Sequence, residues 1–449
     1  MQPRLLGAAV DVLLIALVVT VVTRLSFIYE YDHGGRSFVL PLATVTAALA
    51  VVTDSRLSRW PSRRIWGPPV IVCFAALSAY GAARWISSFG AVNPSDARAY
   101  GVSWIKDLFV AGAIVVAIDS TRRLRLAALA WCAAIAAAAL PTVLQWLTGT
   151  SDSDWWGFAR TDLAFIDGQF IRQAGGSLES NNFAQWLVIS LPIALYFIFG
   201  ANPPHASVRR RWLTMAFGAG CAAIAVAALL LTRSRGGLVG LAVVLVVAIA
   251  LYTSWRATLA ATIAIVIVIL AVPTSRDQVD RIGEARALFG GEVAGDSSAA
   301  GYASTFRAGL RMFADEPVTG VGSKNFIVHY PAISADLGID TTGARRTTHN
   351  VAIELLSETG LVGFVTFTVG FVLVVVAIVR AKRFFRQAGA LDSADLQRAL
   401  LVALTGFVVT GATLNLGNPQ LLLLAMGMGI AGCKVARLPS LASAGAANT

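Results

Sequence analysis

Long apolar runs, separated by short polar segments, follow one another along almost the whole chain. A run of roughly 20 mostly apolar residues crosses the ~30 Å hydrocarbon core of a bilayer as one α-helix. Because lipid offers the backbone no hydrogen bonds, runs of this length must pair their backbone groups within the helix. We therefore predict an all-α integral membrane protein with about twelve transmembrane helices. The predicted spans lie near residues 5–22, 37–53, 68–90, 103–118, 124–147, 181–199, 213–231, 236–253, 257–272, 351–379, 398–415 and 418–433.

The composition of the chain agrees with this class. Of the 449 residues, 56% are hydrophobic and 14% are charged, whereas a soluble domain carries about 25% charged residues. Every cysteine lies inside an apolar run, which argues against a disulfide framework and against a thiolate metal site. No cluster of His, Asp and Glu has the spacing of metal ligands, and no glycine-rich nucleotide loop follows a strand. We therefore expect neither a metal nor another cofactor.

Lysine and arginine are distributed unevenly over the segments between the runs. If the N-terminus is cytoplasmic, the segments on that side hold 19 lysines and arginines, whereas the opposite segments before residue 273 hold eight. Positive residues accumulate in cytoplasmic loops, so the topology is predicted to be N-in and C-in. The run 5–22 is too long for a signal peptide and is assigned to the first membrane helix. Anionic lipid explains much of the net charge of +11, so no nucleic-acid partner is expected.

The predicted spans and two long outer segments divide the chain into five parts. These are helices 1–5 in residues 1–148, helices 6–9 with the outer segment 149–180 in residues 149–272, an outer-face loop in residues 273–350, helices 10–12 in residues 351–435, and a short cytoplasmic tail in residues 436–449. The 78-residue loop far exceeds a usual connection of about 4–6 residues. Four of its apolar residues are spaced for one face of a helix: Tyr302, Phe306, Leu310 and Phe313. We expect an ordered amphipathic helix at the membrane surface.

Arginines stand at the boundary of the eighth predicted span, in the string TRSRGGLV. By the predicted topology, Arg172, Arg233 and Arg235 face the same outer compartment as the long loop. A guanidinium offers a planar fork of donors that matches phosphate oxygens. Gly236 and Gly237 would let an anion approach the N–H groups at the start of the helix. The alternative is that the arginines at this boundary only extend toward the membrane interface.

His349 lies at the junction between the long loop and the tenth predicted span. With a pKa near 6.5, an imidazole can accept a proton at physiological pH. Asn350 suits the N-cap of the following helix. A carboxylate could orient the histidine, and the candidates are Glu179, Glu354 and Glu358. The alternative is a histidine that is only solvated in a polar loop.

Four short strings, in order along residues 160–430, resemble motifs of the bacterial O-antigen ligase and polymerase family. The first is Arg172 and Gly175 with Asn181-Asn182-Phe183-Ala184, the second is Arg233-Ser234-Arg235-Gly236, the third is Arg307 with Pro317, Gly320 and Gly322, and the fourth is His349-Asn350 with Glu354 and Gly360 to Gly363. Each string is short, but together they share one predicted face and the order of the family's motifs. The N-terminal five helices match the family only in being apolar.

The resemblance implies a GT-C-like membrane glycosyltransferase that takes a glycan from undecaprenyl diphosphate. Family members transfer the glycan en bloc, without a metal, to a sugar hydroxyl of lipid A-core or of another glycan acceptor. The site would face the periplasm from the bacterial inner membrane, with His349 as the catalytic base. The diphosphate would be held by Arg235, Arg307 and Arg172, with Arg233, Asn350 and Glu354 in support.

Two other functions stay open at this stage. A polymerase of O-antigen or exopolysaccharide would share the donor and the motifs and would differ in its acceptor. A transporter of a lipid-linked anion would also need arginines at the membrane boundary. Transporters usually show paired broken helices in two related halves, and the sequence has no such pairing.

Overall fold

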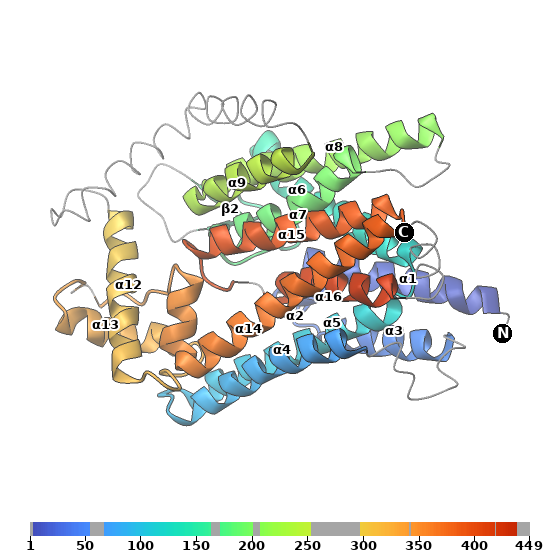
Figure 1. Ribbon diagram of the computed structural model, residues 1–449. Helices are drawn as coiled ribbons and strands as arrows, with labels where there is room; N and C mark the ends of the chain where they lie inside the picture. The colour runs from blue at the N-terminus through green and yellow to red at the C-terminus, as the bar shows by residue number, and fades with distance from the viewer. Residues whose placement is uncertain are drawn as a thin grey trace.

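The computed structural model describes residues 3–53, 67–162, 171–200, 207–252, 297–340, 343–417 and 419–437. Within these ranges the chain is a bundle of long helices that run side by side (Figure 1). The helices of the bundle are α1 (Pro3–Thr23), α2 (Leu25–His33), α3 (Val39–Thr53), α4 (Pro68–Ile86) with the 3₁₀ turn η1 (Ser87–Phe89), α5 (Pro94–Ala117), α6 (Thr121–Thr148), α7 (Ser180–Phe199), α8 (Val208–Leu231), α9 (Arg235–Tyr252), α14 (Val351–Gln387), α15 (Leu391–Gly411) and α16 (Pro419–Ala436). The predicted all-α membrane class is confirmed.

Nine helices of the described ranges are long and apolar enough to cross a membrane, and α3 and α9 are shorter apolar helices. Each of these helices coincides with a predicted span. The remaining predicted span, 257–272, lies outside the described residues, as do residues 273–296 of the long loop, the arginines between 54 and 66, Arg256 and the tail from 438. The number of twelve, the orientation in the membrane and the GT-C-like arrangement therefore stay predictions.

The burial of the helices follows from their sequences. A helix that is apolar on all sides belongs in the interior of a bundle, and α7 and α16 are almost wholly surrounded by other helices. In α14, by contrast, Leu361, Val365 and Val372 recur on an outward face and remain about half exposed. A row of exposed apolar residues along a long helix is the surface that lipid tails would cover.

The two ends of the bundle differ in chemistry. At the first, which we call the arginine-rich end, Arg125 at the start of α6 pairs with Asp392 at the start of α15 and donates to the Tyr196 hydroxyl in α7. Arg123 is salt-bridged there to Asp11 of α1 at 2.8 Å. At the second, the loop end, α12 (Ser297–Asp315) crosses the ends of the long helices and α13 (Phe326–Asp336) lies beside it (Figure 1).

A short β-hairpin, which the sequence did not predict, lies before α7. Strands β1 (Arg160–Asp162) and β2 (Arg172–Gly175) pair antiparallel, with Asp162 opposite Arg172. Ser180, the first residue of α7, donates its hydroxyl to the Asp162 carboxylate at 2.9 Å. The hairpin is thereby fixed to the beginning of α7, at the loop end of the bundle.

Candidate functional site

The turn between α8 and α9 puts Arg235 at the first position of α9. Arg233 adopts a left-handed backbone with φ of 51°. The Ser234 hydroxyl accepts the N–H of Gly237 at 3.2 Å and so caps the helix. A cation at the first position of a helix opposes the helix dipole, whose N-terminal end is positive. The start of α9 is therefore a place where a bound anion would be stabilised by both the dipole and Arg235.

The two glycines after Arg235 have a packing role. A Cβ atom on Gly236 would lie 2.2 Å from the Thr413 hydroxyl oxygen, and one on Gly237 would lie 2.7 Å from the Ala184 Cβ atom. A side chain at either position would therefore overlap with a neighbouring helix. The two glycines therefore allow α9 to approach α7 and the end of α15. The approach of an anion to their backbone N–H groups stays a prediction.

Arg172 ties the hairpin to the ends of two helices. Its Nε atom donates to the Thr232 carbonyl oxygen at 3.1 Å, and its Nη2 atom donates to Asn181 Oδ1 at 2.9 Å. The same Asn181 oxygen accepts the Ser234 hydroxyl at 2.8 Å. Asn181 therefore links Arg172 directly to the turn that precedes Arg235.

Arg172 and Arg235 act on each other and on Tyr302 of α12. Burial lowers the pKa of Arg172; the carboxylate of Asp162 opposes this shift and the charge of Arg235 adds to it. Burial raises the pKa of the Tyr302 phenol, and the two guanidinium charges counteract that rise. A nearby positive charge disfavours the charged form of Arg172. A pair of cations in this arrangement is suited to bind an anion.

His349 packs against Tyr302. The centroids of the two rings are 4.7 Å apart and their planes are inclined by 59°. Burial lowers the pKa of His349 to about 4, and the charges of Arg346 and Arg172 contribute in the same direction. The imidazole is therefore neutral at neutral pH. Within the described ranges, neither ring nitrogen makes a hydrogen bond, so a lone pair is available to a substrate.

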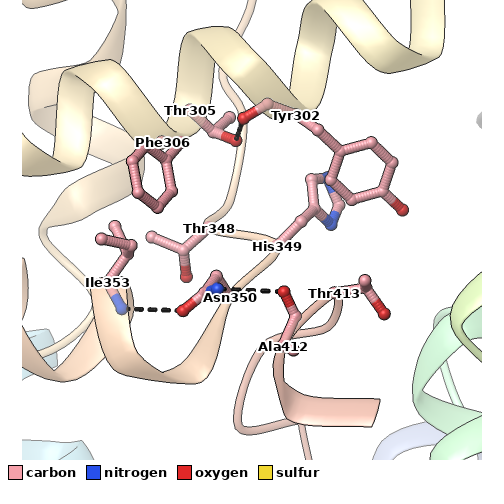
Figure 2. A pocket seen from close by; sticks show the side chains of 9 residues that line it. All are labelled: Tyr302, Thr305, Phe306, Thr348, His349, Asn350, Ile353, Ala412 and Thr413. Carbon is pink, nitrogen blue, oxygen red and sulfur yellow. Dashed lines mark hydrogen bonds between the residues drawn. The ribbon is translucent and has the colours of Figure 1, made fainter. Parts of the chain in front are cut away.

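A cavity of about 180 Å³ lies beside these two rings. Figure 2 shows His349 and Tyr302 together on one side of it and Phe306 and Ile353 on the other. The side chains come from α12, from the start of α14 and from the end of α15. The residues that line the cavity are Tyr302, Thr305, Phe306, Thr348, His349, Asn350, Ile353, Ala412 and Thr413.

Asn350 and Glu354 hold the segment that joins α15 to α16. Asn350 Oδ1 accepts the N–H of Ile353 at 3.0 Å, so Asn350 caps α14, and its Nδ2 atom donates to the Ala412 carbonyl oxygen at 2.9 Å. One turn later, Glu354 Oε2 accepts the N–H of Leu416 at 2.7 Å. Both side chains therefore attach the start of α14 to residues 412–416, of which Ala412 and Thr413 line the cavity.

None of the three carboxylates considered as orienting groups hydrogen-bonds to His349 in the described part of the chain. Glu354 is engaged with the backbone of Leu416. Glu358 accepts the N–H of Lys324 at 2.8 Å, and Glu179 accepts the Nδ2 of Asn182 at 3.2 Å. The orienting role considered for Glu179, Glu354 and Glu358 therefore has no hydrogen bond to support it among the described residues, whereas the ring of Tyr302 contacts the imidazole.

The Pro-x-x-Gly-x-Gly turn of the loop is docked on a break in α14. Gly360 interrupts the helix with φ of 62° and ψ of −165°. The N–H of Leu361 donates to the Pro317 carbonyl oxygen at 2.8 Å, and the N–H of Val321 donates to the Ser357 carbonyl oxygen at 2.9 Å. Two motifs that are separate in the sequence thus form one structural unit, and this unit positions α12 over the loop end.

Arg307 occupies a different position from the other predicted ligands of the diphosphate. It lies on α12 directly after Phe306, its side chain is exposed, and it does not line the cavity. On the same helix, Ala308 and Met312 are buried, whereas Phe306 and Leu310 are more than 40% exposed. Of the predicted apolar face of α12, Phe306 and Leu310 are therefore largely exposed, whereas Tyr302 packs against His349. A contact between Arg307 and the diphosphate stays a prediction.

Three residues of the site had no role in the sequence-based hypothesis of catalysis. Tyr302 was predicted only as part of an apolar helix face, and Asn181 only as part of a motif-like string. Thr413, at the end of α15, had no recognisable signal. The described residues contain no group of three or more His, Cys, Asp or Glu side chains that could hold a metal ion.

Comparison with known families adds an independent observation. Residues 220–368 match the family model described as O-antigen ligase. This match supports membership of the O-antigen ligase family. The matched segment runs from α8 into α14 and contains Arg235, Arg307 and His349, whereas Arg172 precedes it. No curated protein matches the chain.

The match to the O-antigen ligase model over residues 220–368 supports a class of protein and of substrate, but no specific donor, acceptor or mechanism. Together with the apolar helices, it supports a multi-pass membrane protein and a glycosyltransferase-type enzyme of O-antigen processing. The family implies lipid-linked glycans in general as substrates.

Proposed function

We propose that this protein is an O-antigen ligase that transfers a glycan from undecaprenyl diphosphate to a sugar hydroxyl of lipid A-core. The observation that carries the proposal is a set of contacts: Asn181 joins Arg172 to the turn before Arg235, and His349 packs against Tyr302. The charges of both arginines act on the Tyr302 phenol. Two cations and a neutral base in one place match the two requirements of the reaction: a charged leaving group and a hydroxyl to be deprotonated. The active site would face the periplasm from the inner membrane.

The proposed step is a single displacement at the anomeric carbon. The acceptor oxygen forms a bond to that carbon while its proton passes to His349. The bond from the anomeric carbon to the diphosphate oxygen breaks, its electron pair stays on that oxygen, and undecaprenyl diphosphate is the leaving group. Attack from the face opposite the leaving group inverts the configuration. Arg172 and Arg235, with Arg307 as a further candidate, would stabilise the charge that grows on the diphosphate.

The electrostatics of the site give His349 a consistent role. The pKa of His349 lies at about 4 because the ring is buried near Arg346 and Arg172. A bound diphosphate would offset these positive charges, and a nearby negative charge favours the imidazolium form. Donor binding would therefore raise the pKa of His349 and make it a stronger base once the leaving group is in place.

The principal alternative is a polymerase that adds repeat units to a lipid-linked chain. The predicted number of spans and the single long loop before the last three helices favour the ligase. A deletion strain of the host tests this choice. Loss of a ligase leaves full-length polymer on the lipid carrier, whereas loss of a polymerase leaves single repeat units on the surface glycolipid.

A second experiment tests the transfer itself. The purified protein in lipid nanodiscs is mixed with the lipid-linked glycan and the acceptor that the deletion strain accumulates. Formation of glycosylated acceptor without an ion gradient supports the enzyme and excludes the transporter. Absence of any product with both native substrates would remove the proposed function.

A further inference from the structure

The cavity beside His349 combines features that suit a sugar ring. We propose that it binds one pyranose ring of the acceptor, held between the aromatic side chains of α12 and a row of hydroxyl groups. This inference rests on the proposed transfer reaction and assigns one part of the acceptor to named side chains.

The size of the cavity limits its occupant. Its volume is about 180 Å³. Sites for drug-sized ligands are larger, at ~300–1,000 Å³. The cavity thus has room for one ring and its substituents, and the rest of the acceptor must lie outside it.

The walls of the cavity have two kinds of surface. Tyr302 and Phe306 are four residues apart on α12 and so share one face of the helix, and Ile353 adds an apolar group from α14. Thr305, Thr348 and Thr413 line the rest (Figure 2). The hydroxyls of Thr305 and Thr413 donate to the carbonyl oxygens of Tyr302 at 3.0 Å and Thr410 at 3.3 Å, so each can still accept a hydrogen bond from a sugar hydroxyl. A sugar ring likewise has C–H groups on its faces and hydroxyls on its edge. The electron-rich face of an aromatic ring attracts C–H groups, and threonine hydroxyls can both donate and accept.

The position of the cavity assigns it to the acceptor. His349 is part of its lining, so a hydroxyl of a ring bound there would lie next to the proposed base. Arg172 and Arg235 are not part of the lining, yet both act on the Tyr302 phenol. The diphosphate of the donor therefore belongs beside that phenol. The cavity is then left for an uncharged sugar ring of the acceptor.

Phe306 gives the sharpest test, because it lines the cavity without a ring contact to His349. Steady-state kinetics of the full chain in nanodiscs would use the acceptor and the lipid-linked glycan from the deletion strain. For Phe306→Leu we expect the KM for the acceptor to rise about threefold to tenfold, with the KM for the donor unchanged. Phe313→Leu is the matched control, since it makes the same change on α12 away from the cavity.

Tyr302 is tested by two variants. Tyr302→Phe keeps the ring, so the KM for the acceptor should stay within about twofold of the wild type. Tyr302→Leu removes the ring and should raise the KM for the acceptor about threefold to tenfold. If Tyr302 only positioned His349, Tyr302→Leu would lower kcat and shift the pH profile without changing the KM for the acceptor.

Each outcome decides the proposal. An unchanged KM for the acceptor in both Phe306→Leu and Tyr302→Leu overturns it, and so does a rise confined to the KM for the donor. If the wild type transfers no glycan, the proposed function fails, and calorimetric titration of the purified protein with the acceptor then tests the cavity separately. Binding that Phe306→Leu weakens and Phe313→Leu leaves intact would support the sugar site; absence of binding by the wild type would exclude it.

Discussion

Gly320 and Gly360 meet backbone to backbone where the long loop docks on α14. A Cβ atom on Gly320 would lie 2.5 Å from the Glu358 carbonyl carbon, and one on Gly360 would lie 2.3 Å from the Val318 carbonyl oxygen. Both glycines have positive φ, at 68° and 62°. The loop that carries α12, and with it the Tyr302 ring against His349, is therefore held by a contact that no side chain can enter.

This contact predicts the effect of alanine at Gly360. Its φ and ψ of 62° and −165° lie in a region that is essentially restricted to glycine. We expect Gly360→Ala to destabilise the protein by about 3 kcal/mol or more, from backbone strain and steric overlap together. The measurement is the temperature at which half of the protein in detergent is lost from the monodisperse peak in size-exclusion chromatography.

Gly389 provides the matched control. It also has a positive φ, of 71°, but nothing lies within 4 Å of a Cβ atom built on it. Gly389→Ala should cost only the left-handed backbone penalty of about 1–2 kcal/mol. Equal losses of thermal stability in the two variants would contradict the docking contact at Gly360.

Arg172 is predicted to have a structural role as well as a charge. Its Nε and Nη2 atoms donate to Thr232 and Asn181. A lysine lacks the planar guanidinium fork and cannot make both bonds in this geometry. We expect Arg172→Lys to lower stability by about 1–3 kcal/mol, because a buried acceptor loses its donor. Thermal stability in detergent would report this loss, and a variant as stable as the wild type would show that the two bonds are dispensable.

Arg235 is predicted to act mainly on the donor. Arg235→Lys keeps the positive charge at the first position of α9 but loses bidentate hydrogen bonding to phosphate. We expect the KM for the lipid-linked donor to rise by about tenfold, equivalent to roughly 1.4 kcal/mol, with little change in the KM for the acceptor. Arg311→Lys, on the exposed side of α12 in a pair with Asp315, serves as a control. Full activity of Arg235→Lys would rule out a bidentate contact with the diphosphate.

The pH dependence of transfer tests the role of His349. A general base acts in its neutral form, so activity is present above its pKa and is lost as pH falls through it. Because the pKa of His349 is lowered to about 4, the acid limb of kcat/KM should lie well below pH 6.5. The acid limb of kcat should lie higher, since a bound diphosphate raises the pKa.

The variant His349→Gln completes this test. Removal of a general base lowers kcat by about 10²–10⁴-fold, and the acid limb assigned to the imidazole should disappear from the profile. An acid limb that stays at the same pH in His349→Gln would assign it to another group. Near wild-type turnover in that variant would withdraw the assignment of His349 as the base.

Glu354 is predicted to act through the backbone of Leu416. A glutamine retains an oxygen that can accept this N–H, so Glu354→Gln should keep the pH profile of transfer and most of the stability. Glu354→Ala leaves a buried N–H without its acceptor and should cost about 1–3 kcal/mol. A pH profile that shifts in Glu354→Gln would instead argue for electrostatic coupling to His349.

Much of the helical framework could be predicted because its signal is local. Lipid forces each apolar run to satisfy its own backbone hydrogen bonds, so the length and hydropathy of a run predict a helix without knowledge of its neighbours. The cap at Asn350 and the start of α9 at Arg235 are local for the same reason, since each depends on residues within one turn.

The sequence by itself determined the membrane class, the helices and the strings that carry the arginines and His349. Only the tertiary structure decided what these residues touch. The hairpin that contains Arg172 consists of strands too short to give a periodic signal in the sequence. The segment to which Asn350 and Glu354 hydrogen-bond lies about sixty positions further along the chain. The spacing of Tyr302 and Phe306 predicts a helix face, but whether such a face meets lipid, the bundle or His349 depends on packing between distant segments. That packing depends on contacts between residues far apart in the sequence. Such contacts leave no pattern in the local sequence around either residue.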